Sequence, residues 1–371
     1  MEYRMMGNTG VKVSALGFGA MRLPVLEDGT IHEEEAIRMI RHAIDEGVNY
    51  VDTAYPYHSG MSEVLVGKAL KDGYREKTYL ATKCPVWEIK SPEDFDRILD
   101  EQLSKLQVET IDFYLLHAIG KERFENIIQK FDLIKKMEQA KAEGKIRYIG
   151  FSFHDNAEAF VNIVDSYDYW DFCQIQMNYI DIHNQATLEG MEYAASKGLG
   201  IIIMEPLLGG KLANLPQNVI EVLSNEKTPV EWALDFLWDR KEVSLLLSGM
   251  STMEQTVDNI AYASRSKIGM LTKDQRVMYA NAKRIYDTMA LVSCTKCAYC
   301  MPCPFGLDIP KTFEAYNATV AKGMKAAKEV YEEIEIKADS CRSCKKCEQV
   351  CPQAIPISDV MKKVETCFTG E

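Results

Sequence analysis

Eight of the eleven cysteines lie in two short runs near the end of the chain. The first run, CTKCAYCMPCP, contains Cys294, Cys297, Cys300 and Cys303, and the second, CRSCKKCEQVCP, contains Cys341, Cys344, Cys347 and Cys351. Each run spaces its first three cysteines by two residues and ends in Cys-Pro, a pattern typical of iron–sulfur ligation. Zinc is the alternative, because two separated C-x2-C pairs can bind one zinc ion. The paired triads and the Cys-Pro endings favour iron–sulfur clusters.

The C-terminal tail resembles the bacterial ferredoxin modules that hold two [4Fe-4S] clusters. We therefore expect two such clusters, with the fourth cysteine of each run binding the cluster of the other run. One cluster then takes Cys294, Cys297, Cys300 and Cys351. The other takes Cys341, Cys344, Cys347 and Cys303. The last gap of the first run is one residue shorter than that of the second, which is a departure from the pattern.

A second set of residues that could carry out chemistry consists of four polar residues at or just after the ends of apolar runs: Asp52, Tyr57, Lys83 and His117. A tyrosine hydroxyl has a pKa of about 10, and a nearby ammonium lowers that pKa. A carboxylate can hold the ammonium in place, and a histidine can donate a hydrogen bond to a carbonyl oxygen. Such a set can polarise a carbonyl group and protonate the developing alkoxide. The alternative is that each residue only completes a buried polar network.

The elements that must position these residues are short apolar runs separated by amphipathic ones. The expected strands are 15–20, 49–53, 78–83, 111–117, 147–152, 172–176, 199–204 and 243–249. These runs are continuously apolar, as in parallel sheets buried on both faces. They predict an α/β fold of the (β/α)8 barrel type. A doubly wound open sheet is the rival, but the glycine-rich turn of a dinucleotide-binding version is missing after the first strand. A hairpin before residue 15 is expected to plug one end of the barrel.

Three segments resemble the aldo/keto reductases: DTAYPYHSGMSEVLVGKAL (52–70), ATK (81–83) and LLHA (115–118). The resemblance extends over roughly residues 1–265. It implies that Tyr57 donates a proton, that Lys83 and Asp52 tune it, and that His117 orients the carbonyl group. It also implies a nicotinamide cofactor, NADP(H) or NAD(H), bound across the barrel mouth without a Rossmann fold.

The same resemblance implies cofactor-binding positions at Ser152, Gln176, Met204, Gly249, Gln255, Asn259 and Arg22. The first two correspond to positions that hold the carboxamide, and the segment 249–259 to the one that holds the adenosine and its phosphate. Met204 stands where many members place an aromatic ring under the nicotinamide, so stacking is weaker here. No Lys or Arg occurs between Lys241 and Arg265, where a ribose 2′-phosphate commonly finds its positive charge. Arg22 in the first loop is the candidate cation.

Composition limits the location and the partners. The formal net charge of −12 argues against a nucleic-acid surface and against docking on an anionic membrane. No stretch of 18 uncharged apolar residues and no secretory signal is visible, so a cytoplasmic protein is expected. We expect a barrel domain at 1–285 and a ferredoxin-like domain at 286–371, in which 310–335 forms a helical spacer or a docking surface.

Together these patterns predict an NAD(P)H-dependent enzyme that reduces a small aldehyde or ketone to an alcohol. Its iron–sulfur tail is structural, redox-sensing or electron-transferring. A first alternative is a reductase whose barrel receives electrons through the clusters from a redox partner, an external ferredoxin or flavoprotein. A second is a non-catalytic electron-transfer or partner-binding protein, against which the complete set of four polar residues argues.

Overall fold

The computed structural model describes residues 1–288 and 291–369. It consists of two compact units, and each is described by itself. The first unit comprises 1–206 and 233–271, and the second comprises 207–232 and 272–371. This division differs from the boundary expected after residue 285. The helix at 273–287 falls in the second unit because it packs against a short helix in the segment 207–232.

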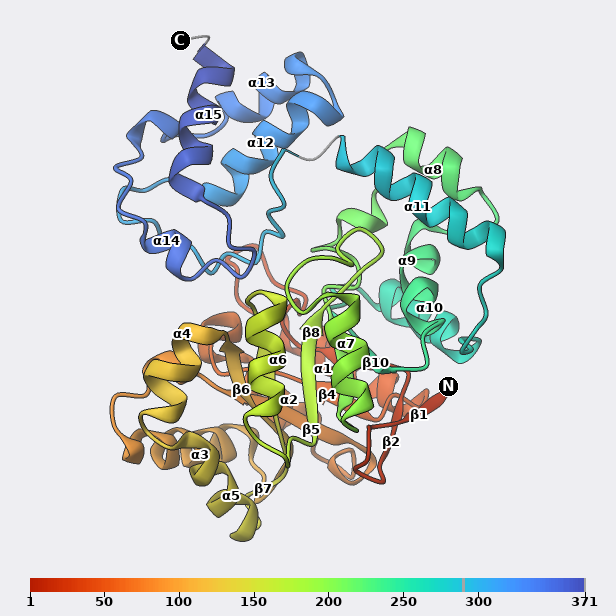
Figure 1. The fold of residues 1–371 in the computed structure, drawn as a ribbon, viewed down its shortest axis with the longest axis vertical. Helices are drawn as coiled ribbons and strands as arrows, with labels where there is room; N and C mark the ends of the chain where they lie inside the picture. The colour runs from red at the N-terminus through yellow and green to blue at the C-terminus, as the bar shows by residue number, and fades with distance from the viewer. Residues whose placement is uncertain (289–290, 370–371) are drawn as a thin grey trace. The chain divides into compact units, whose positions relative to one another are not determined.

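The first unit contains a closed barrel of parallel strands in the order β10-β3-β4-β5-β6-β7-β8-β9 (Figure 1). The strands are β3 Leu16–Gly19, β4 Tyr50–Asp52, β5 Tyr79–Cys84, β6 Ile111–Ile119, β7 Ile146–Phe153, β8 Phe172–Gln176, β9 Gly200–Met204 and β10 Val243–Ser248. Almost all of their residues are buried, as expected where side chains fill the barrel and helices cover it. The predicted (β/α)8 barrel is confirmed.

Helices follow the barrel strands in the sequence. They are α1 Glu33–Asp45, α2 Ser62–Ala69, α3 Pro92–Leu106, α4 Lys121–Arg123, α5 Leu133–Ala142, α6 Ala157–Asp165, α7 Thr187–Ser196, α9 Pro229–Trp238 and α10 Met253–Ser264. Local signals set their ends: a capping box of Ser91 and Asp94 starts α3, with Pro92 as the first helical residue.

An antiparallel hairpin, β1 Tyr3–Met5 and β2 Lys12–Ser14, precedes the barrel. Met6 and Val13 of this segment are fully buried in one apolar cluster with interior residues of the barrel strands, among them Tyr50 and Phe113. The hairpin thus closes one end of the barrel, as the sequence predicts.

The second unit is mainly helical. Its helices are α8 Gln217–Leu223, α11 Lys273–Asp287, α12 Ile309–Ala321, α13 Met324–Glu332, α14 Lys346–Gln349 and α15 Ile357–Thr369. The helical stretch expected at 310–335 is two helices, because Gly323 takes a left-handed φ of 89° between them. The apolar core of the second unit includes Leu307, Ile309, Phe313, Ile355, Ile357 and Met361.

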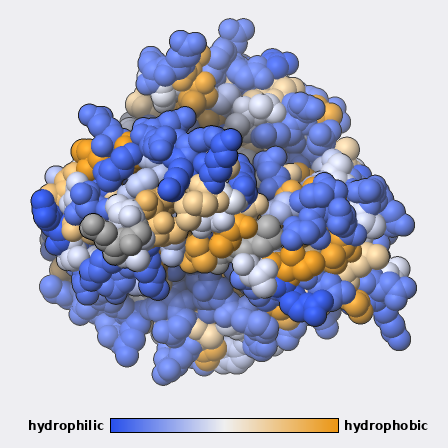
Figure 2. Space-filling model, turned by 90° about the horizontal axis from the view of Figure 1, so that it is seen from above, coloured by the Kyte–Doolittle hydropathy of each residue, from blue (hydrophilic) through white to orange (hydrophobic). Residues whose placement is uncertain are grey.

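The surface is mostly hydrophilic, with small scattered hydrophobic patches on the face that Figure 2 shows. Within the described residues, no helix has the length and apolar character needed to cross a membrane.

Candidate active site and cysteine-lined cavities

The four polar residues predicted for catalysis lie at the carboxyl ends of neighbouring barrel strands. Asp52 is the last residue of β4, and Tyr57 begins the turn that follows it. Lys83 lies next to the end of β5, and His117 lies near the end of β6. In this fold the carboxyl ends of the strands surround the active site.

Lys83 is held in an ion pair with Asp52. Its Nζ lies 2.7 Å from Oδ1 and 2.9 Å from Oδ2 of the carboxylate, and it donates to the carbonyl oxygen of Thr53 at 2.7 Å. The same Nζ lies 3.5 Å from the hydroxyl of Tyr57. Lys83 is 0% exposed and Asp52 is 3% exposed, so water does not screen the pair. The ammonium is therefore fixed within hydrogen-bonding reach of the tyrosine.

His117 completes the set. Its ring is nearly perpendicular to that of Tyr57, with 6.2 Å between centroids, and lies 5.0 Å from the ring of Trp87. Burial, and then the charge of Lys83, hold the pKa of His117 well below its ordinary value, so the imidazole is neutral at neutral pH. No hydrogen bond to the described residues engages its buried Nδ1.

The backbone around these side chains is strained. His58 and Ser59, directly after Tyr57, have φ of 50° and 55°, and Ala118, directly after His117, has φ of 52°. Left-handed conformations are costly for residues with a Cβ and cluster at functional sites. These strained residues directly follow the two side chains expected to contact the carbonyl oxygen.

A buried polar network behind β5 was not predicted. Gln102 of α3 donates to the backbone oxygen of Lys83 at 3.0 Å and to Glu63 of α2 at 2.6 Å. Thr82 also donates to Glu63, and Tyr114 donates to Gln102. Glu63 belongs to the quoted 52–70 segment, but nothing in its spacing signals that it faces Gln102. The network fixes the strand end that carries Lys83.

The residues expected at the nicotinamide carboxamide lie at the ends of β7 and β8. The Ser152 Oγ accepts a hydrogen bond from the Ala118 N–H at 2.7 Å, and its own proton remains able to donate. Gln176 donates to Asp181 at 3.2 Å and accepts from Gln185 at 3.4 Å. Both side chains are buried and oriented by these bonds.

The expected adenosine segment lies close to Arg22. The side chain of Arg22 packs on Gly249, where a Cβ would meet it at 3.2 Å, and its carbonyl oxygen accepts from Ser251. Gln255 accepts from the Ser251 N–H at 2.8 Å. Asn259 is buried and donates to Ser248 at 3.1 Å, which leaves fewer of its atoms for a ligand. The structure thus places the candidate cation beside the segment that lacks one.

Met204, the residue expected under the nicotinamide, is the last residue of β9 and is partly exposed. Its sulfur lies 3.5 Å from Nε2 of Gln174. The eight cysteines of the two runs lie in the second unit, where they line two cavities.

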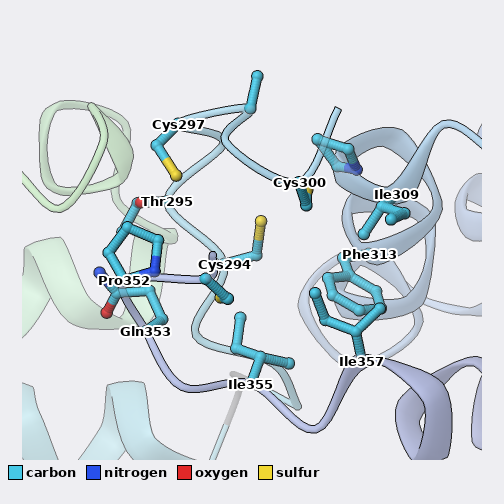
Figure 3. Close-up of a pocket in the computed structure, with 13 residues that line it drawn as sticks. Cys294, Thr295, Cys297, Cys300, Ile309, Phe313, Pro352, Gln353, Ile355 and Ile357 are labelled. Atoms are coloured by element: carbon cyan, nitrogen blue, oxygen red, sulfur yellow. The ribbon is translucent and has the colours of Figure 1, made fainter. Parts of the chain in front are cut away.

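The first cavity is lined by cysteines of both runs: Cys294, Cys297, Cys300 and Cys351 (Figure 3). Apolar side chains including Phe313, Ile355, Ile309 and Ile357 form the rest of its wall. The second cavity is lined by the complementary set, Cys303, Cys341, Cys344 and Cys347, again with Ile309 and Ile357. No three His, Cys, Asp or Glu side chains in the described chain converge on a point for a single metal ion. Four thiols around a cavity are the donors that a [4Fe-4S] cluster takes.

The two runs have left-handed residues at the same two positions. Lys296 and Ala298 of the first run have φ of 56° and 63°, and Ser343 and Lys345, at the matching positions of the second, have φ of 52° and 59°. This repeat directs three cysteines of each run toward one cavity.

Burial raises the pKa of two thiols that line the cavities, to about 12 for Cys300 and about 11 for Cys347. Neighbouring cysteines of the same cavity add to both shifts. Thiolates packed together out of water need positive charge between them, which iron supplies. The cavities therefore fit clusters in donor type and number.

Two models of known protein families match the chain. The model of the aldo/keto reductase family matches residues 15–273. The chain belongs to the aldo/keto reductase family. A second model, of the 4Fe-4S dicluster domain, matches residues 290–355 and includes both cysteine runs.

Relatives of this aldo/keto reductase come from plants and bacteria. L-galactose dehydrogenase of Arabidopsis thaliana is 30% identical over 289 residues, which cover 70% of this chain and 88% of the plant protein. The holo form of aldo-keto reductase AKR11C1 from Bacillus halodurans has a TM-score of 0.64 at 25% identity and matches 76% of this chain and 96% of its own. An aldo/keto reductase from Klebsiella pneumoniae, solved with NADP and acetate, has a TM-score of 0.63 at 21% identity and covers 77% of this chain and 96% of its own.

Arg123 of this aldo/keto reductase was not predicted to lie at the site. It donates to the carbonyl oxygen of Ala118 at 2.7 Å, and its guanidinium lies 5.3 Å from the ring centre of Trp87. It thus holds both the residue after His117 and the ring beside it. Its position at the end of the short helix α4, which follows a long strand, gave no sequence signal.

Proposed function

We propose that the barrel reduces the carbonyl group of a small aldehyde or ketone to an alcohol with NADP(H) or NAD(H), and that the second unit holds two [4Fe-4S] clusters. The observation that carries the reductase proposal is the Lys83 ammonium, fixed between the Asp52 carboxylate and the Tyr57 hydroxyl. Such an arrangement favours transfer of the tyrosine proton to a developing alkoxide.

The chain's own residues have separate roles in the proposed reaction. A bound nicotinamide supplies the hydride that makes the new C–H bond. Tyr57 gives its proton to the carbonyl oxygen, and the Lys83 ammonium stabilises the phenolate that remains. Neutral His117 donates a hydrogen bond to the same oxygen, which lowers the barrier by stabilising the charge that develops there. Ser152 and Gln176 hold the carboxamide, and Arg22 is the residue that faces a 2′-phosphate.

A second candidate is a reductase that draws electrons from its clusters. One observation favours this second candidate. The segment Leu207–Trp232 follows Met204 of the barrel in the chain, yet it belongs to the unit that carries the cysteines. Within that unit, Gly209 lies against the backbone of Thr295, between the first two cysteines.

One anaerobic experiment separates the candidates. Protein with measured iron content is mixed with each nicotinamide and a panel of aldehydes and ketones. One alcohol formed per NAD(P)H consumed, with the clusters left oxidised, supports the first candidate. Alcohol formed only after the clusters are reduced by a low-potential dye, without any nicotinamide, supports the second. No alcohol under either condition refutes both.

A further inference from the structure

The loop that carries Cys344 is cationic and exposed. Its residues 342–346, which we call the cationic loop, are Arg342, Ser343, Cys344, Lys345 and Lys346, and every one is exposed. Cys344 is the one exposed cysteine among the eight that line the cavities. In the described parts of the chain, no ion pair engages the three cations of this loop, although the charge of Lys345 contributes to lowering the pKa of Asp359. Positive charge therefore faces water directly beside the second cavity.

The matching loop of the first run has neither property. Because both loops have left-handed residues at the same two positions between cysteines of equal spacing, their side chains can be compared position by position. Thr295, which is 2% exposed, stands where Arg342 does, and Ala298 stands where Lys345 does. The cation of the first loop, Lys296, is paired with Glu314 at 2.7 Å. The exposed positive charge is thus specific to the loop beside the second cavity and is not a general feature of the cysteine motif.

An apolar side chain lies at the same cavity. Phe305, two residues after Cys303, lines the second cavity and is 43% exposed. Aromatic residues and Arg are enriched at protein interfaces relative to the rest of the surface.

We propose that the cationic loop and Phe305 form a docking surface for a small acidic protein that carries one electron at a time. The inference rests on the proposed clusters. In the docked complex the reduced carrier loses one electron and the cluster of the second cavity gains it. No bond is made or broken, and no proton moves.

The charge distribution favours an acidic protein over a nucleic acid. The chain carries a net charge of −12, so a long polyanion is repelled by most of its surface. Three cations neutralise few phosphates and give little affinity for nucleic acid at physiological salt. A small acidic protein is attracted by the cationic loop and repelled by the acidic surface around it. This raises the association rate and selects one orientation.

The test is anaerobic calorimetric binding of a flavodoxin, an acidic one-electron carrier, to the iron-loaded full chain. Titrations are run at ionic strengths of about 0.01 M and about 0.3 M, where screening differs strongly. The test variant is Arg342→Glu/Lys346→Glu, which leaves the left-handed Lys345 in place. The matched control is Lys325→Glu/Lys328→Glu on α13, an equal charge change at exposed lysines outside both cavities.

We expect the flavodoxin to bind the wild-type protein more weakly at high salt. The test variant should lose at least about tenfold in affinity, because like charges then face each other at the interface. The control should change by less than about twofold, because distant exposed charges are screened. Loss in both variants or in neither overturns the proposal. Equal binding of basic cytochrome c, or displacement of the flavodoxin by a single-stranded oligonucleotide, also overturns it.

Iron content and the cluster spin-resonance spectrum are recorded for each protein. If the charge-reversed variant loses iron, Arg342→Gln/Lys346→Gln replaces it and should lose affinity by a smaller factor. Wild-type protein without iron after reconstitution refutes the cluster assignment, whereas iron-loaded protein that ignores the flavodoxin refutes the docking surface. The two failures are therefore distinguishable.

Discussion

Cys351 of the second run and Cys294 of the first line the same cavity. Replacing Cys351 with Ala should therefore damage the cluster beside the first run before the one beside Cys341. Cys367→Ala is the matched control, because this residue of α15 lines neither cavity. Iron content and spin-resonance spectra after anaerobic reconstitution make the comparison. Loss of the cluster at Cys341 with the other intact would show that each run binds its own.

Gly209 and Gly210 offer a test of how the segment after β9 supports the first cavity. Both have left-handed φ, 65° and 87°, so alanine strains the backbone at either position by about 1–2 kcal/mol. Only at Gly209 would a Cβ overlap the carbonyl oxygen of Thr295, and at Gly210 it meets open space. We expect Gly209→Ala to retain less iron and to unfold at a lower temperature than Gly210→Ala. Equal iron retention would contradict this contact.

Tyr57→Phe should lower kcat by roughly 10²–10⁴-fold with little change in nicotinamide affinity, since it removes the proposed general acid. The control is Tyr55→Phe, whose hydroxyl lies 3.3 Å from Glu101. Single-turnover reduction and fluorescence titration of the cofactor separate chemistry from binding. Near-normal turnover in Tyr57→Phe would remove this residue from the mechanism.

Arg22→Ala should weaken NADPH binding and leave NADH binding nearly unchanged, because only the former carries the 2′-phosphate. A hydrogen bond to a charged group contributes about 1.5–3 kcal/mol, so the wild-type preference for NADPH should lie between about tenfold and about 150-fold, well below a thousandfold. The dissociation constants of NADPH and NADH measure this preference, with NADH as the internal control. A preference above about a thousandfold that survives the substitution would place the phosphate elsewhere.

Low pH should destabilise the barrel through its buried imidazoles. Burial lowers the pKa of His154 to about 4, and that of an unfolded histidine is about 6.5. Between these values the unfolded state binds a proton that the folded state does not, so the free energy of unfolding falls as pH drops. From pH 7 to pH 5 the free energy of unfolding should fall less in His154→Gln than in wild type, by on the order of 1 kcal/mol. Denaturant unfolding at the two pH values measures both changes. Identical pH dependence would contradict it.

Much of the fold could be predicted because its signals are local. The apolar runs fixed the eight strands, and the strand ends placed Asp52, Lys83 and His117. The capping residues Ser91 and Pro92 likewise marked the start of α3.

What could not be predicted depends on contacts between distant segments. Gln102 reaches Lys83 only because α3 packs beside β5. The packing of α8 against α11, which moves 207–232 into the second unit, leaves no trace in either segment. The break at Gly323 did have a signal, since glycine is the usual residue at such an end.

Ile309 and Ile357 each line both cysteine cavities, so a wall of two aliphatic side chains is shared between them. Water and ions have no place in such a wall, and rearrangement of polar groups adds little to the barrier for an electron that crosses it. Clusters in both cavities, as proposed above, would be two one-electron centres that act as one reservoir, filled from the exposed side one electron at a time. Its full capacity is two electrons, the number that a single hydride carries.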